Sequence, residues 1–278
     1  MRFVVVDLEA TCWSKETEPE LYKIQSRESE IIEIGAVVLD EDLSVVSEFQ
    51  RFVRPIRHEN LSEFCVSLTN IGQDDVDKAD EFATVYHELV AWMGGETDKF
   101  RFVSWGSYDD RQIRRQCRAC GIEEPSWIPI DAKDEFVAWY RGQTGQRCRV
   151  GLLGAIQHLN MSFEGTAHRG IDDARNLVRI FQHILDPKHL SKDARKALSV
   201  LRLRTPKASH LGHMREAFSD AKGWFHRVGK ELKFLGLAED LGGGKGLTLT
   251  DKGRVVQIVL PDITASSNEN SQGESSAC

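Results

Sequence analysis

The chain opens with an apolar run that ends on two carboxylates. Phe3–Val6 is followed directly by Asp7, Leu8 and Glu9. Because alternate side chains of a β-strand share one face, the carboxylates of Asp7 and Glu9 should point the same way. Two like charges this close repel each other unless a cation lies between them, and Mg²⁺ and Mn²⁺ favour carboxylate ligands. Taken alone, the pair fits two solvated acids at a strand end better than a metal site, so the rest of the chain must decide.

Length and composition predict a globular protein with one large domain, or one domain and a smaller one. The chain has 278 residues, of which 41% are hydrophobic, as expected for a protein with a real core. Its cysteines lack framework spacing, and Cys117 and Cys120 form a single CxxC with no second pair to complete a zinc site. We find no signal peptide and no apolar run long enough to span a bilayer. The expected setting is reducing and cytoplasmic.

Charge is unevenly distributed along the chain. Residues 1–186 carry 21 Lys and Arg against 33 Asp and Glu, whereas residues 187–260 carry 15 against 7. The acidic part offers carboxylates for a metal, and the basic part would attract a polyanion. A small helical module that is basic for no functional reason explains the same numbers, so charge alone does not decide.

Hydrophobic periodicity predicts a mixed α/β domain over residues 1–186. Strands are expected over 3–8, 31–39, 47–53 and 100–105, and helices over 81–93, about 109–120, 150–159 and 172–185. Residues 15–30 are expected to form a surface excursion. Either Asp109 or Asp110 is a plausible N-cap for the helix that follows the fourth strand.

Residues 190–260 are predicted to form a separate basic, mainly helical module. Helices are expected near 191–203 and 219–235, followed by short apolar pieces around a glycine-rich turn at 242–246. This order is similar to a winged-helix module, which places a basic helix on nucleic acid. A protein-interaction module whose aromatic residues form its core is an equal alternative. Residues 261–278 have the composition of a disordered tail.

Acids and a histidine occupy the ends of several predicted elements. Asp7 and Glu9 end the first strand, Asp109 follows the fourth, and His168 and Asp173 lie five residues apart at the entry to a helix. Residues at element ends are held in place by a rigid scaffold, as functional residues commonly are. We therefore expect Asp173 and His168 to reach the sheet edge where Asp7 lies.

Three of these segments resemble the exonuclease motifs of the DEDDh (DnaQ-like) 3′→5′ exonucleases. They are Asp7–Cys12, the pair Tyr108-Asp109, and His168 followed by Asp173 at the family's five-residue offset. Residues 7–13, 30–35 and 105–109 are most similar to the branch that contains the histone mRNA and RNA-interference exonucleases. Three motifs in order, with suitable elements between them, are far more specific than one. The resemblance covers about residues 1–185.

The resemblance implies an RNase H-like mixed sheet flanked by helices and a mechanism with two Mg²⁺ or Mn²⁺ ions. Two ions about 4 Å apart stabilise both the attacking and the leaving oxygen of an in-line displacement. By this resemblance Asp7 bridges the ions, Glu9 and Asp173 complete the site of the attacking water, and Asp109 supports the second ion. His168 is the general base, for which a pKa near neutrality is suitable.

Two further acids lie directly beside the expected ligands. Asp110 follows Asp109, and Asp172 precedes Asp173. The motif register of the family selects Asp109 and Asp173. We assign Asp110 and Asp172 to helix capping or to solvent.

Substrate contacts are expected near the first two motifs. The resemblance implies that the backbone of Ala10 and Thr11 meets the terminal ribose. Trp13 and Tyr108 are candidates for stacking on bases, because aromatic faces bind single strands without sequence preference. Packing in the core is an equal alternative for each ring. Arg169 is a candidate for a phosphate contact, with a simple surface role as the alternative.

The predicted function is metal-dependent 3′→5′ exonuclease activity on RNA or short single-stranded nucleic acid, releasing nucleoside 5′-monophosphates. Trimming or proofreading of DNA 3′ ends is the second enzymatic alternative. An inactive RNase H-like scaffold that binds nucleic acid or protein should lack an acid, yet all five positions are filled. The sequence begins at the first motif, so the N-terminal RNA-binding module of the histone mRNA exonuclease is not expected. The oligomeric state stays open.

Overall fold

The computed structural model describes residues 2–40, 43–144, 146, 148–185, 229, 232–233, 237–240 and 247–250. The chain divides into two units. The first contains Met1–Val137 and Cys148–His183, and the second contains Ala138–Arg147 and Ile184–Cys278. The predicted helix at 191–203, most of the one at 219–235 and the tail at 261–278 lie outside the described residues.

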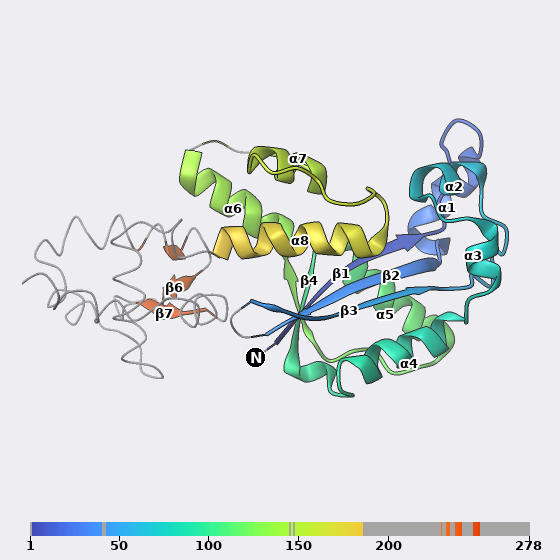
Figure 1. The fold of residues 1–278 in the computed structure, drawn as a ribbon, viewed down its shortest axis with the longest axis horizontal. Helices are drawn as coiled ribbons and strands as arrows, with labels where there is room; N and C mark the ends of the chain where they lie inside the picture. The colour runs from blue at the N-terminus through green and yellow to red at the C-terminus, as the bar shows by residue number, and fades with distance from the viewer. Residues whose placement is uncertain are drawn as a thin grey trace, which may run out of the picture. The chain divides into compact units, whose positions relative to one another are not determined.

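A five-stranded mixed sheet is the frame of the first unit (Figure 1), in the order β3-β2-β1-β4-β5. The strands are β1 (Arg2–Ala10), β2 (Ile31–Leu39), β3 (Val45–Phe52), β4 (Phe100–Ser104) and β5 (Ile128–Asp131). β1 pairs antiparallel with β2 and parallel with β4, so it lies at the centre of the sheet. This is the mixed α/β architecture that the sequence predicted, with β5 as an additional edge strand.

Helices cover both faces of the sheet (Figure 1), and the side chains of β1 alternate between these two layers. Val4, Val6 and Leu8 belong to a core cluster that also contains residues of α4 (Phe82–Trp92) and α5 (Tyr108–Cys120). On the opposite face, Phe3 makes an edge-to-face contact with Phe181 of α8 (Gly170–Leu185), at 5.6 Å between ring centroids. Since odd-numbered positions of this strand face α8, Asp7 and Glu9 also face α8.

The sequence missed several elements around this frame. They are α1 (Pro19–Glu28), α2 (Glu63–Thr69), α3 (Gln73–Asp77), the 3₁₀ turn η1 (Thr97–Lys99), β5 and α6 (Ala132–Thr144). The predicted helix at 150–159 is present as α7 (Leu152–His158). The predicted surface excursion holds α1, which contributes no buried residue. The expected N-cap was also wrong, because Ser107 occupies the N-cap position of α5, without a side-chain capping bond, and both Asp109 and Asp110 lie in the first turn.

The second unit contains a short two-stranded antiparallel ribbon. Its strands are β6 (Ala238–Asp240) and β7 (Leu247–Leu249), and Glu239 is paired with Thr248. The winged-helix resemblance and the domain boundaries drawn from the sequence stay predictions. Throughout the described part of the chain, we find no helix whose length and hydropathy would let it traverse a bilayer.

Candidate active site

Two glycines allow the first turn of α8 to lie directly against the sheet. A Cβ atom at Gly35 of β2 would lie only 2.0 Å from the carbonyl carbon of Gly170, so no side chain fits there. A Cβ at Gly170 would lie 3.0 Å from the backbone oxygen of Asp7. Absence of both side chains brings the start of α8 beside the middle of β1 and β2. Asp173, in the first turn of that helix, is thereby carried to the acidic end of β1.

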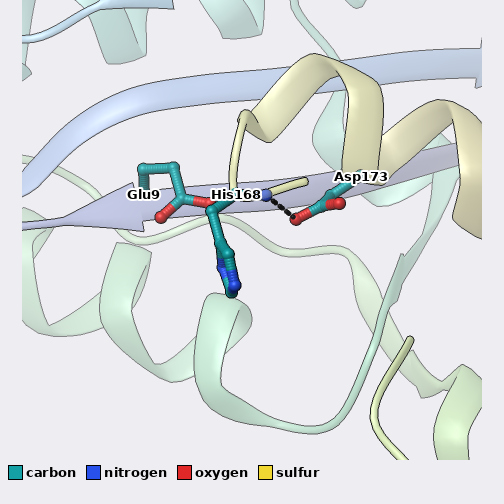
Figure 2. A group of neighbouring side chains, drawn as sticks. All are labelled: Glu9, His168 and Asp173. Carbon is teal, nitrogen blue, oxygen red and sulfur yellow. Dashed lines mark hydrogen bonds between the residues drawn. The ribbon is translucent and has the colours of Figure 1, made fainter. Parts of the chain in front are cut away.

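Glu9, His168 and Asp173 meet at this point (Figure 2). Each offers one ligand atom, and these atoms all lie within 4.8 Å of one another. Glu9 comes from β1, His168 from the loop before α8, and Asp173 from α8 itself, as Figure 2 shows. Both carboxylates are buried, whereas His168 is exposed. The end of β1 and the segment 168–173, which are far apart in the sequence, therefore converge on one place.

The backbone of His168 is held in an unusual conformation. Its φ is +62°, in the left-handed region that residues other than glycine seldom occupy. The His168 N–H donates a hydrogen bond to Asp173 Oδ2 at 3.1 Å, drawn as a dashed line in Figure 2. Strain of this kind persists only where surrounding contacts impose it, and it is found mostly at functional sites.

Asp109 joins α5 to the same end of β1. It is buried in the first turn of α5, and its Oδ1 accepts a hydrogen bond from the backbone N–H of Leu8 at 3.2 Å. Leu8 lies between Asp7 and Glu9 in the strand. The bond therefore fixes Asp109 against the segment that carries the other two acids.

The carboxylates of this cluster have raised pKa values. Burial, followed by the charges of Asp109, Asp173 and Glu9, raises the pKa of Asp7 well above its ordinary value. Burial raises the pKa of Glu9 to about 8, with Asp173 and Glu33 adding to the effect. Burial is also the main cause that raises the pKa of Asp109 to about 7 and that of Asp173 to about 6. Buried acids that repel one another in this way are suited to a divalent cation, which favours their ionised forms.

The donor set fits a hard divalent metal. It consists of carboxylate oxygens with one imidazole at hand, which matches the ligand preference of Mg²⁺ and Mn²⁺. This fit gives a prediction for the metal-free protein. The ordinary pKa values of these acids are 3.8 and 4.5, and in the folded protein they are raised to about 6 to 8. At a pH between these limits the folded state binds more protons than the unfolded chain. Its free energy of unfolding should therefore fall as the pH rises through this window.

Metal ions should reverse this loss, because they bind the deprotonated acids. We expect Mn²⁺ to raise the melting temperature more at pH 8 than at pH 5.5, as measured by thermal denaturation with Mn²⁺ or with EDTA. The Asp74→Asn variant is the control, since this exposed acid on α3 pairs only at 3.7 Å with exposed Lys78. A metal-induced shift that is equal at both pH values, or larger at pH 5.5, would contradict the assignment.

The candidate substrate residues have different environments. Trp13 is only 3% exposed, and its ring meets that of His58 edge to face at 4.6 Å between centroids, which favours its core alternative. Tyr108 is 42% exposed at the start of α5, so its ring is accessible to a base. Thr11 is buried, and its Oγ1 accepts a hydrogen bond from the backbone N–H of Glu30 at 2.9 Å. Contacts between substrate and any of these residues stay predictions.

Arg169 is engaged within the protein. Its Nε and Nη2 donate to the two carboxylate oxygens of Glu33, at 3.1 and 3.2 Å. The guanidinium carbon also lies 5.2 Å from the centroid of the Phe52 ring. These contacts favour a structural role over the expected phosphate contact, which stays untested.

The neighbouring acids have roles of their own. Asp110 is buried and accepts hydrogen bonds from Trp127 Nε1 at 2.7 Å and Arg114 Nε at 3.0 Å, so its assignment to capping or solvent was wrong. Asp172 accepts from the backbone N–H of Thr166 at 2.9 Å and fastens the loop before α8, which resembles capping. Neither carboxylate belongs to the group that Glu9 forms with His168 and Asp173.

Sequence reasoning missed Glu33, although a signal was present. Glu33 interrupts the apolar run of β2, and it is fully buried. An acid inside a strand that is otherwise apolar on both faces is costly unless it is paired, so it marks a specific role.

The fold is that of a known family. The family model described as Exonuclease matches residues 4–181, and the chain belongs to this family. The human 3'-5' exoribonuclease 1 is 32% identical over 191 residues, covering 65% of this chain and 51% of the relative. The Drosophila melanogaster 3'-5' exonuclease Snipper is 30% identical over 194 residues, covering 63% and 66%. The chain spans about half the length of the first curated relatives it matches.

Solved structures give the same result. The nuclease domain of 3'hExo, a DEDDh family member bound to rAMP, matches with a TM-score of 0.56 and 29% identity, over 66% of this chain and 91% of that domain. Cell-death related nuclease 4 matches with a TM-score of 0.59 over 91% of this chain and 81% of that chain, and at 20% identity it supports the fold alone. The RNase H-like architecture and the DEDDh resemblance inferred from the sequence are thereby confirmed.

Proposed function

We propose that this protein is a 3′→5′ exonuclease that shortens single-stranded RNA from its 3′ end and releases nucleoside 5′-monophosphates. The observation that carries the proposal is the convergence of Glu9, His168 and Asp173 at the end of β1, within 4.8 Å of one another. The names of its relatives, 3'-5' exoribonuclease 1 and 3'-5' exonuclease eri1, favour RNA over DNA.

In this proposal Asp7, Glu9, Asp109 and Asp173 hold two divalent ions, Mg²⁺ or Mn²⁺. When bound, such ions stabilise charge on the phosphate and make water a better nucleophile at neutral pH. The protein contributes the fixed positions of these acids, each of which belongs to the central strand or to the first turn of a helix. Rigid placement of this kind is what an in-line displacement requires.

His168 is proposed to act as the general base. Its imidazole is exposed beside Glu9 and Asp173, where a ring nitrogen can take a proton from water. The exposed ring of Tyr108 is suited to stack on the terminal base. Ala10 is partly exposed, and its backbone is proposed to meet the terminal ribose. The C-terminal module is proposed to bind nucleic acid or a protein, and the cytoplasmic setting stays a prediction.

The test compares matched 5′-labelled RNA and DNA oligonucleotides incubated with Mg²⁺ or Mn²⁺. We expect a ladder that shortens from the 3′ end of the RNA, vanishes in EDTA, and is at least about a hundredfold slower with Asp173→Asn. Asp74→Asn, which changes an exposed acid, should digest RNA like the wild type. Faster digestion of DNA would transfer the proposal to DNA trimming, and digestion that persists in Asp173→Asn would refute the site.

A further inference from the structure

Glu33 is a fully buried carboxylate whose oxygens are both saturated by hydrogen bonds. Oε1 accepts from Gln50 Nε2 at 2.6 Å and from Arg169 Nη2 at 3.2 Å. Oε2 accepts from Arg169 Nε at 3.1 Å and from the backbone N–H of Gly170 at 3.0 Å. A buried charge is tolerated only with such partners, and the fork of an arginine binds a carboxylate in a defined orientation.

The donors of Glu33 belong to the segment that carries His168. Arg169 and Gly170 follow it directly, and Gly170 is the first residue of α8. Glu33 itself pairs with Glu9 across β2 and β1, so it lies next to the acidic cluster. Its carboxylate therefore ties the central sheet to the two residues after the candidate base.

A second fastening lies on the other side of His168. Its N–H donates to Asp173 Oδ2 at 3.1 Å, and its φ of +62° is kept by the residues around it. Glu33 fixes the segment from the sheet, and Asp173 fixes it from the helix. With the backbone of His168 held on both sides by these hydrogen bonds, its imidazole stays beside the site.

We propose that Glu33 is a positioning residue that acts through Arg169 and Gly170 to hold the imidazole of His168 beside Glu9 and Asp173. It does not contact substrate in this role. The effect on activity rests on the proposed function, whereas the orientation of residues 168–170 is tested separately by hydrogen exchange. The alternative is an ion pair between Glu33 and Arg169 that contributes only to stability.

The same helix supplies a matched control. Arg175, six residues further along α8, donates through Nε to both carboxylate oxygens of Glu48 on β3, at 3.1 and 3.2 Å. This pair also joins an arginine of α8 to a glutamate of the sheet. The pair is exposed. Arg175 Nη1 also pairs with Asp172 at 2.9 Å, but Glu48 makes no contact with the residues 168–170 among the hydrogen bonds of the described part of the chain.

The experiment compares Glu33→Gln with Glu48→Gln on a 5′-labelled single-stranded RNA at saturating Mn²⁺. We expect Glu33→Gln to lower kcat about ten- to a hundredfold and to change KM less than about threefold, as misplacement of a catalytic group does. In metal-free protein, hydrogen exchange at the backbone N–H of His168 should be about tenfold faster in Glu33→Gln. Glu48→Gln should match the wild type in both measurements.

A Glu33→Gln protein that is less stable but has unchanged kcat and unchanged exchange at His168 would overturn the inference. If this variant does not fold, Arg169→Lys tests the inference instead, because lysine keeps the positive charge but cannot make the bidentate contact with Glu33. It should lower kcat and accelerate the same exchange, and failure to do so would also overturn the inference. If the wild type does not digest RNA, the proposed function fails, while exchange at His168 still tests Glu33.

Discussion

Replacing Asp7 by asparagine should lower the rate of RNA digestion at least about a thousandfold while making the metal-free protein more stable. Asp7 is partly buried, and desolvation followed by the charges of Asp109, Asp173 and Glu9 raises its pKa. Asparagine removes the central charge that a divalent ion needs, and with it the repulsion that the metal-free protein bears. Activity and stability are therefore expected to move in opposite directions.

Both effects of Asp7→Asn are measurable on one preparation. Single-turnover digestion of labelled RNA gives the loss of rate, and thermal denaturation in EDTA at pH 8 gives the gain in melting temperature. Stabilisation by added Mn²⁺ should become smaller than in the wild type. Asp74→Asn should change none of the three quantities. Retention of more than a tenth of the activity, or a lower melting temperature in EDTA, would count against the assignment of Asp7.

Replacing His168 by asparagine should lower kcat about 10²- to 10⁴-fold, the range for loss of a positioned general base. Asparagine is chosen because it tolerates the left-handed conformation that His168 adopts, with φ of +62°. The loop should therefore keep its shape while the ring nitrogen is lost. Since His168 is not among the proposed metal ligands, stabilisation by Mn²⁺ should fall much less than in Asp7→Asn.

A companion variant separates the base from the backbone. His168→Gly also accepts a positive φ, and it leaves space at an exposed position for a small molecule. Added imidazole should restore part of the activity of His168→Gly and none of that of Asp7→Asn. Full activity of His168→Asn would show that another group takes the proton from water.

The sequence predicted the central strands because they carry a strong apolar signal. β2 was placed from Ile31 to Leu39, where all nine residues are buried. By contrast, α1 contributes no buried residue. β5 is an edge strand of four residues with Pro129 inside it, which weakens its strand pattern. Burial of β2 thus left a clear pattern in its sequence, whereas α1 and β5 left none of that kind.

The site was predictable where the motif spacing names its members, and less so where a partner is remote. Glu9, His168 and Asp173 do meet as expected. The contact of Glu33 with Arg169 joins residues 136 positions apart, and no local pattern announces it. Asp110 was misassigned for the same reason, because Trp127, which donates to it, lies on a later segment. Local patterns identify candidate side chains, and long-range contacts decide what each one does.

Because side chains of β1 alternate between the two faces of the sheet, the side to which Asp7 and Glu9 point depends on whether their positions in the strand are odd or even. Phe3 packs on α8 from the same face as Asp7 and Glu9, whereas Val4, Val6 and Leu8 pack on the other side. Insertion or loss of a single residue after Val6 would turn both acids into the apolar layer under α4 and α5. Only a change of two residues would keep their orientation. Related chains that diverge in length within this strand should therefore do so in steps of two.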